Sequence, residues 1–148
     1  MDHVEAEIKP PKNPLTVKIN MAILDYYFQW FAKKYLPAFK PVITSGYRTE
    51  EKNKELGGAQ NSAHLHGLAY DIVLHYPGGQ VVPKAQSKVV FDEYIAPNWH
   101  GYALWEDDHI HLNLSRKVTE YAAMMGMAVM GVIGYHVIHK MLSGGENK

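Results

Sequence analysis

Two short segments of this chain concentrate histidine and aspartate at close spacing. The first is Ser62-Ala63-His64-Leu65-His66-Gly67-Leu68-Ala69-Tyr70-Asp71, and the second, later in the chain, is Asp108-His109-Ile110-His111. Together they offer two imidazoles and one carboxylate to a divalent metal, with a spare carboxylate three residues before the last imidazole. A catalytic zinc ion typically has three protein ligands and a water molecule, whose pKa falls from about 15.7 to about 7. Because the chain has no Cys, a closed cysteine-ligated zinc site is excluded.

The first segment leads into a predicted buried strand. Residues 69–74 are a short apolar, β-branched run that Asp71 alone interrupts with a charge. Burying an ionised carboxylate is costly unless a cation or hydrogen bonds compensate it, so Asp71 needs a partner. Gly67 permits a sharp turn that lets His64 fold back over this carboxylate.

The second segment leads into a predicted half-buried strand. Residues 109–114 alternate polar and apolar side chains, so His109, His111 and Asn113 share one face. If this strand lies beside the strand of Asp71, His111 can meet Asp71 and His64 around one ion. We expect His109 to lie on the same face, nearer the edge.

These segments belong to a longer pattern, which also contains Thr44-Ser45-Gly46-Tyr47-Arg48, Asn53 and Gly57-Gly58. From about residue 41 to residue 116 the chain resembles the zinc D-alanyl-D-alanine carboxypeptidase family, which includes phage endolysins and vancomycin-resistance dipeptidases. The resemblance implies an α+β fold of the Hedgehog/D-Ala-D-Ala peptidase type, with a small antiparallel sheet carrying the zinc site between flanking helices. It also implies hydrolysis of peptide bonds in bacterial cell-wall peptidoglycan, by carboxypeptidase or endopeptidase action.

The resemblance implies roles for individual residues. It implies that zinc (Zn2+) is bound by His64, Asp71 and His111. It makes Asp108 the general base and Arg48 the group that polarises the substrate. Arg48, Ser62 and Tyr47 would contact the substrate. Many family members differ from this chain at two positions, with Glu in place of Asp108 and Asp in place of Asn113.

Some of these roles have competing predictions. Residues 106–108 form an acidic run, which is usually a solvated loop, so Glu106 and Asp107 remain alternatives to Asp108 as base. Arg48 could instead pair with Glu50 or Glu51 on the surface. Four further histidines are predicted to be ordinary loop or strand residues, although the first and last lie close enough to the metal to shape the pocket: His66, His75, His100 and His109.

Length and composition set the wider frame. A chain of 148 residues has room for one domain with a core and an appendage. Equal numbers of basic and acidic residues, 15 of each, argue against nucleic acid as a partner. We predict a flexible, Pro-rich arm without a signal peptide at 1–14, the peptidase domain at 15–117, a hydrophobic helix at 118–142 and a polar tail at 143–148.

The patterning of the domain predicts further elements. Residues 15–36 are predicted to form a helix whose core side carries Ile19, Ile23, Tyr26, Tyr27, Trp30 and Phe31. We expect a strand at 42–45, a short helix capped by Thr49 and stopped at Gly57, a turn at 77–80 and a second amphipathic helix at 84–95. Residues 98–108 are predicted to be a loop rich in Trp and Tyr.

Residues 121–138 contain no Lys, Arg, Asp or Glu. A helix of this length would be about 27 Å long, near the lower limit for crossing a bilayer core of about 30 Å. We therefore predict a C-terminal transmembrane anchor, of undecided orientation because basic residues flank both ends. The alternative is a helix packed on the domain or on a partner, which Gly126, Gly131 and Gly134 would also suit.

The combined prediction is a membrane-anchored zinc peptidase acting on peptidoglycan, in a phage lytic setting, a membrane-containing virion or the host cell envelope. Two alternatives remain. One is a non-catalytic, membrane-anchored structural or binding module that keeps the zinc fold. The other is a soluble enzyme whose tail helix mediates assembly with further copies or virion partners. Asp108 favours an enzyme, since a binding module has no use for an unliganded carboxylate beside the metal.

Overall fold

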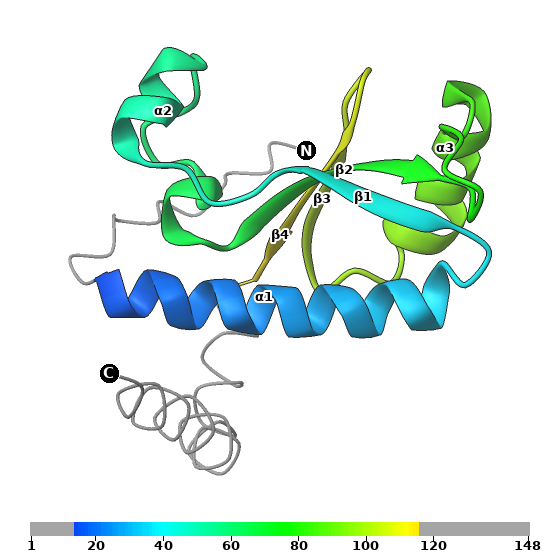
Figure 1. Ribbon diagram of the computed structural model, residues 1–148, viewed down its shortest axis with the longest axis horizontal. Helices are drawn as coiled ribbons and strands as arrows, with labels where there is room; N and C mark the ends of the chain where they lie inside the picture. The colour runs from blue at the N-terminus through cyan, green and yellow to red at the C-terminus, as the bar shows by residue number, and fades with distance from the viewer. Residues whose placement is uncertain (1–13, 116–148) are drawn as a thin grey trace, which may run out of the picture. The chain divides into compact units, whose positions relative to one another are not determined.

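Four antiparallel strands and one long helix dominate residues 14–115, the part of the chain that the computed structural model describes (Figure 1). The helix α1 spans Pro14–Tyr35, and the strands are β1 (Lys40–Ser45), β2 (Ala69–His75), β3 (Gly101–Trp105) and β4 (Ile110–Leu114). The strand order is β1-β2-β4-β3. The predicted α+β class with a small antiparallel sheet is confirmed, and the two strands that carry predicted metal ligands are the central pair.

Four short helical segments complete the unit. They are α2 (Glu50–Glu55), the 3-10 helix η1 (Ala63–His66), α3 (Lys84–Val90) and the π-helical turn η2 (Phe91–Ile95). Figure 1 shows α2 and α3 at opposite ends of the sheet. Thr49 caps α2 as predicted, because its hydroxyl accepts a backbone N–H of the first turn. The predicted helix at 84–95 is present, but it changes from α to π geometry after Val90.

The two-residue period of β2 and β4 separates the core from the candidate site. Asp71 pairs with His111 and Ile72 pairs with Ile110, and directly paired residues share a face of the sheet. The apolar face is almost fully buried and carries Ile72, Leu74, Ile110, Leu112 and Leu114. Helix α1 covers this face, where Phe28 contacts the ring of Tyr70 at 5.3 Å between centroids. Asp71 and His111 therefore lie on the face opposite α1.

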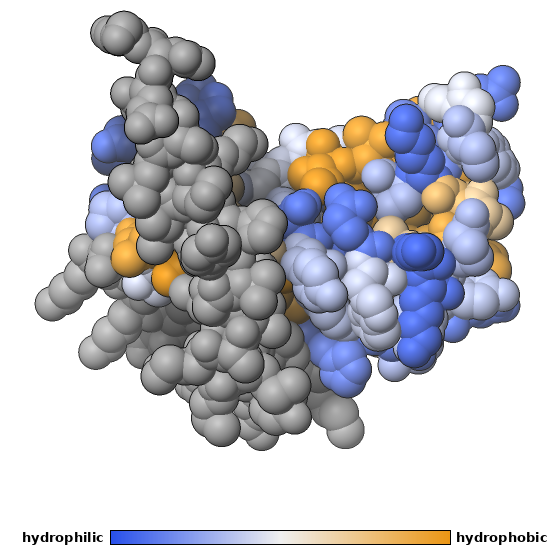
Figure 2. Space-filling model, turned by 60° about the horizontal axis from the view of Figure 1, so that its bottom comes forward, coloured by the Kyte–Doolittle hydropathy of each residue, from blue (hydrophilic) through white to orange (hydrophobic). Residues whose placement is uncertain are grey.

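The core side of α1 differs from the prediction. Its buried residues are Leu24, Phe28 and Phe31, at i, i+4 and i+7, and of the predicted set this group contains only Phe31. Tyr26 is 76% exposed and Trp30 is 43% exposed. Apolar and aromatic side chains of α1 point to several sides of the helix, so the sheet on which it packs decides which of them are buried. Apolar residues also reach the surface elsewhere in the molecule (orange in Figure 2).

The region predicted as a loop, residues 98–108, contains strand β3, so that prediction is wrong. β3 pairs with β4 along its whole length, from Gly101 opposite Leu114 to Trp105 opposite Ile110. The strand is at the sheet edge, and its burial does not alternate cleanly, which hides the period of two. Tyr102 and Trp105, residue types that favour strands, stand just before a short acidic turn and were the available signal.

The predicted N-terminal arm and hydrophobic C-terminal helix lie outside the described residues, apart from residue 14, which begins α1. Among residues 14–115, no helix combines the length and the apolar character needed to cross a bilayer.

Gly67 supports a test of how α1 holds the segment that carries His64. It has φ of +69°, and an added Cβ would lie 2.6 Å from Met21 Cγ and 2.9 Å from the Val17 carbonyl oxygen. We expect Gly67→Ala to lower the free energy of unfolding by about 2 to 4 kcal/mol, from backbone strain plus overpacking. Chemical denaturation measures this loss.

Gly57→Ala is the matched control, because Gly57 has the same φ of +69° with nothing within 4 Å of the added Cβ. It should cost only the conformational share, about 1 kcal/mol. Equal losses in the two variants would show that the contact with α1 contributes nothing.

Candidate metal centre

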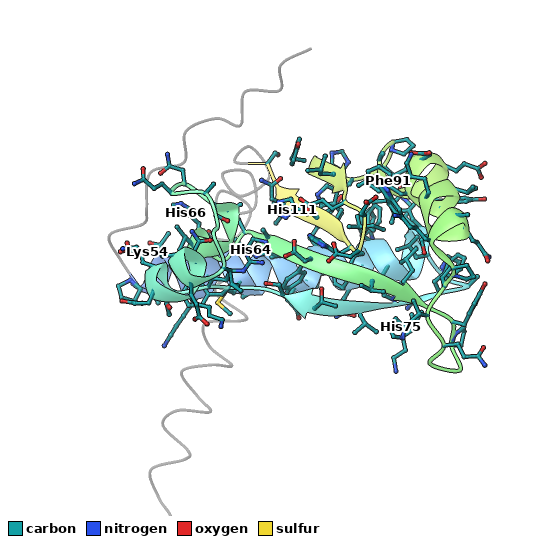
Figure 3. All side chains as sticks on the ribbon, turned by 90° about the horizontal axis from the view of Figure 1, so that it is seen from above. Lys54, His64, His66, His75, Phe91 and His111 are labelled. Atoms are coloured by element: carbon teal, nitrogen blue, oxygen red, sulfur yellow. The ribbon has the colours of Figure 1, made fainter. Side chains whose placement is uncertain are left out.

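The structure brings His64, Asp71 and His111 together. His64 Nε2 lies 3.2 Å from Asp71 Oδ1, and His111 Nδ1 lies 2.9 Å from the same oxygen. The three residues come from η1, β2 and β4, and Figure 3 shows His64 and His111 near one another when the sheet is seen from above. His64 and Asp71 are buried, at 2% and 6% exposure.

This donor set fits a zinc ion. Neutral imidazole and carboxylate are preferred zinc ligands, and a tetrahedral ion with bonds of about 2.0 to 2.2 Å separates its donor atoms by about 3.3 Å. The separations of 3.2 and 2.9 Å are close to this value. Three protein ligands are also the number that leaves a tetrahedral zinc with one open position. The residues present therefore match an open, catalytic type of site.

Backbone contacts fix the orientation of His64. Its Nδ1 lies 2.7 Å from the Gly46 carbonyl oxygen, so Nδ1 donates this hydrogen bond and Nε2 faces Asp71; in the neutral ring, Nε2 is the nitrogen left to bind a metal ion. The backbone N–H of His64 donates to Ser62 Oγ, and its carbonyl accepts the N–H of Arg48. The loop before α2 and the 3-10 helix η1 are thereby tied together at the ligand itself.

A bulge in β1 brings that loop to the site. The register with β2 shifts between Ile43 and Ser45, so that Ser45 stands opposite Asp71. Thr44 lies within the bulge, and its hydroxyl donates to the Asp71 carbonyl at 3.2 Å. Bulges bend a strand and redirect the residues after it, which here include Gly46 and Arg48.

Arg48 completes the surroundings of Asp71. Its Nη2 donates to Asp71 Oδ2 at 2.8 Å, while Nε and Nη2 both donate to Ser45 Oγ. Among the described residues, the ion pair that Arg48 makes is with Asp71, not with Glu50 or Glu51. Arg48 thus lies beside Asp71, and its role toward a substrate stays a prediction.

The pKa of Asp71 follows from these partners. Burial alone would raise this pKa, but hydrogen bonds from His111 and His64 and the charge of those imidazoles outweigh burial and hold it well below its usual range. The carboxylate is therefore ionised at any ordinary pH. It is a prepared ligand for a cation.

Other residues of the pattern have structural tasks in the described region. Ser62 caps η1, and Tyr47 is 45% exposed, so their substrate contacts stay predictions. Asn53 Nδ2 donates to the Ala59 carbonyl at 2.8 Å, and a Cβ at Gly58 would collide with Asn53 Oδ1. Asn53, Gly58 and Ala59 thus shape the turn that leads from α2 toward η1.

Asn113 also has a structural task, which is to hold neighbouring segments of the sheet together. Its Oδ1 accepts the Tyr102 N–H at 3.1 Å, and its carbonyl accepts the Trp99 indole N–H at 2.8 Å. It therefore fastens the edge strand β3 and the segment before it to β4. The departure from Asp at this position leaves the three donors of the site together.

The turn between β3 and β4 holds a second group of titratable side chains. His109 Nδ1 lies 2.6 Å from Asp108 Oδ1, and His109 Nε2 lies 3.0 Å from Glu106 Oε2 and 3.6 Å from Asp71 Oδ1. Asp107 instead pairs with Lys84 of α3 at 2.9 Å. The sequence predicts His109 as an ordinary loop or strand residue that could shape the pocket, and it does not predict the contacts with Glu106 and Asp108. The face that it shares with His111 was a signal only for its approach to Asp71.

Comparison with known proteins identifies the family. The family model described as Peptidase M15 matches residues 17–113, a range that contains every residue of the site. The chain belongs to the peptidase M15 family. The zinc D-Ala-D-Ala carboxypeptidase of Streptomyces albus G is 28% identical over 98 residues, which cover 66% of this chain and 36% of that relative's length. No solved structure gives a significant match.

Membership of the peptidase M15 family confirms the resemblance predicted from the motif residues. The match also reaches from α1 to β4, so it takes in the helix that supports the sheet as well as the ligands. Because the chain spans about a third of the relative it resembles, that protein's activity is only a starting point for a proposal.

The ligand set predicts one zinc per chain, measurable by elemental analysis after dialysis in metal-buffered solution. We expect Asp71→Asn and His64→Ala to lower zinc affinity by about 100-fold or more, since each removes one of three donors. His75→Ala is the control, because it removes a histidine from the far end of β2. His75 Nδ1 there contacts the carbonyl of Gly79, in the turn after the strand, at 2.9 Å. Full occupancy in the doubly substituted His64→Ala, Asp71→Ala protein would contradict this ligand set.

Proposed function

We propose that this chain is a zinc-dependent peptidase that hydrolyses peptide bonds in bacterial cell-wall peptidoglycan. The observation that carries the proposal is that His64, Asp71 and His111 bring their ligand atoms together in a chain of the peptidase M15 family. The relative from Streptomyces, named for zinc and for D-Ala-D-Ala, supports both the metal and the substrate class.

The residues around the cluster supply what hydrolysis needs besides the metal. Zinc, when bound, polarises a carbonyl and acidifies water. Asp108 accepts a proton from the attacking water and passes it to the leaving amine. Arg48 stabilises negative charge on the substrate oxygen, and its bonds to Ser45 and Asp71 fix the guanidinium beside the metal ligands.

Three acids compete for the role of base, and their contacts differ. Asp107 is 92% exposed at its side chain and is paired with Lys84, on α3. Glu106 and Asp108 both contact His109, from opposite ends of the ring. We favour Asp108 because it stands three residues before His111, as the family pattern places the base, and because its side chain is 87% exposed and open to water and substrate.

Isosteric variants of these acids test the assignment. Asp108→Asn should retain zinc while its kcat falls by about 100-fold or more, because the amide cannot accept the proton. Asp107→Asn and Glu106→Gln serve as matched controls with the same loss of charge in the same turn. The assay digests purified cell wall and identifies the newly freed amino groups, which also reveals the bond that is cut. An active Asp108→Asn protein beside an inactive Glu106→Gln protein would move the role to Glu106.

We further propose that residues 121–138 attach the chain to a membrane, which suits a lytic enzyme of a phage, a membrane-containing virion or a host envelope. The support is the absence of charged residues over that length. Because a charge at the bilayer centre costs about 2.5 kcal/mol or more, Val129→Lys with Val132→Lys should abolish flotation with phospholipid vesicles. Ser143→Lys is the control outside the apolar segment. Unchanged flotation of the double variant would show that attachment does not depend on this segment, and a wild-type protein that does not float would favour a packed or assembling helix.

A further inference from the structure

The imidazole of His109 lies between the acidic turn and the candidate metal ligands. It lies in the turn between β3 and β4, only 22% exposed at its side chain, with one ring nitrogen facing Asp108 and the other facing Glu106. A metal ion shared by these three residues would need one nitrogen directed at it together with both carboxylates. Here the two carboxylates contact different nitrogens, so the arrangement is that of a ring held between two acids.

We propose that His109 is a positioning residue that holds Asp108 in place for proton transfer. The proposal rests on the proposed function, in which Asp108 is the base. The bond from His109 Nδ1 to Asp108 Oδ1 is 2.6 Å long, and such shortness is typical of charge-assisted hydrogen bonds. The contact of 3.0 Å between Nε2 and Glu106 Oε2 fixes the far end of the ring.

The need for such a device follows from the exposure of Asp108. A side chain that is 87% exposed in a turn has several solvated rotamers, and only a fraction of them direct the carboxylate at the reaction centre. Proton transfer requires the base within hydrogen-bond reach of the proton, so restricting Asp108 raises the fraction of productive encounters. His109 can impose this restriction because it is itself fixed at both nitrogens.

The backbone aligns His109 with the metal site. The N–H of Glu106 donates to the His109 carbonyl at 3.0 Å, which closes the turn, and β4 then begins at Ile110. His109 therefore precedes His111 by one strand period and shares its face. Its Nε2 reaches to 3.6 Å from Asp71 Oδ1, so the ring spans the space between the metal ligands and the acidic turn.

Two near-isosteric variants separate the two ends of the ring. In His109→Asn the amide nitrogen takes the position of Nδ1 and can still donate to Asp108. In His109→Gln the amide nitrogen takes the position of Nε2 and reaches only toward Glu106. Both variants lack the ring, so they differ mainly in which carboxylate they can contact.

We expect His109→Gln to lower kcat by about 10- to 100-fold with KM and zinc content unchanged, since a small misplacement of a catalytic group has effects of this size. The kcat of His109→Asn should stay within about fivefold of the wild-type value, because its amide can still hold Asp108 in place. In the Asp108→Asn background, His109→Gln should have no further effect, because a residue acting through Asp108 cannot matter once the base is gone.

The other results overturn the proposal in distinguishable ways. Equal kcat in the two His109 variants, whether high or low, would show that the Nδ1 contact has no special role. Activity in His109→Gln but not in His109→Asn would assign the ring to Glu106. Loss of zinc in either variant would place His109 in the metal site. If Asp108→Asn is fully active, the proposed base is wrong, whereas an inactive Asp108→Asn with fully active His109 variants removes only the positioning role.

Discussion

The carboxylate of Asp71 is the group on which the arrangement of the site depends. It is charged, 6% exposed and set in a mostly apolar strand, so the folded state needs partners for both of its oxygens. Oδ1 contacts the imidazoles of His64 and His111, and Oδ2 accepts a hydrogen bond from Arg48. One buried charge thus fixes the relative positions of η1, β4 and the loop after β1, which are far apart in the sequence. A bound cation would add to the same set of attractions.

Strand register links this site to the core. The pairing that places His111 opposite Asp71 also places Ile110 opposite Ile72, on the face that α1 covers. A slip of β4 by one residue would turn His111 into the core and expose Ile110, so the burial of the apolar face enforces the geometry of the donors. The stability of the hydrophobic face and the assembly of the metal centre are two results of one set of hydrogen bonds.

The parts that the sequence could predict are those in which spacing along the chain becomes proximity directly. The turn at Gly67 and the period of two at His109 and His111 are local rules, and they led to three donors that the structure brings together. The Gly46 carbonyl behind His64, by contrast, depends on where a bulge in β1 delivers the loop. The buried side of α1 depends on the shape of the sheet it meets. Such features arise from tertiary contacts that no local pattern contains.

The contrast between the buried donors and the exposed turn follows from their tasks. A ligand set works best when it is rigid before the metal arrives, which burial and backbone bonds such as that from His64 to Gly46 provide. The general base, which we propose to be Asp108, must instead face water and substrate, and the same burial would prevent this. A side chain that is itself partly buried and in contact with both regions resolves this conflict. His109 meets that requirement, because its two nitrogens connect the rim of the metal centre with the carboxylate that remains in solvent.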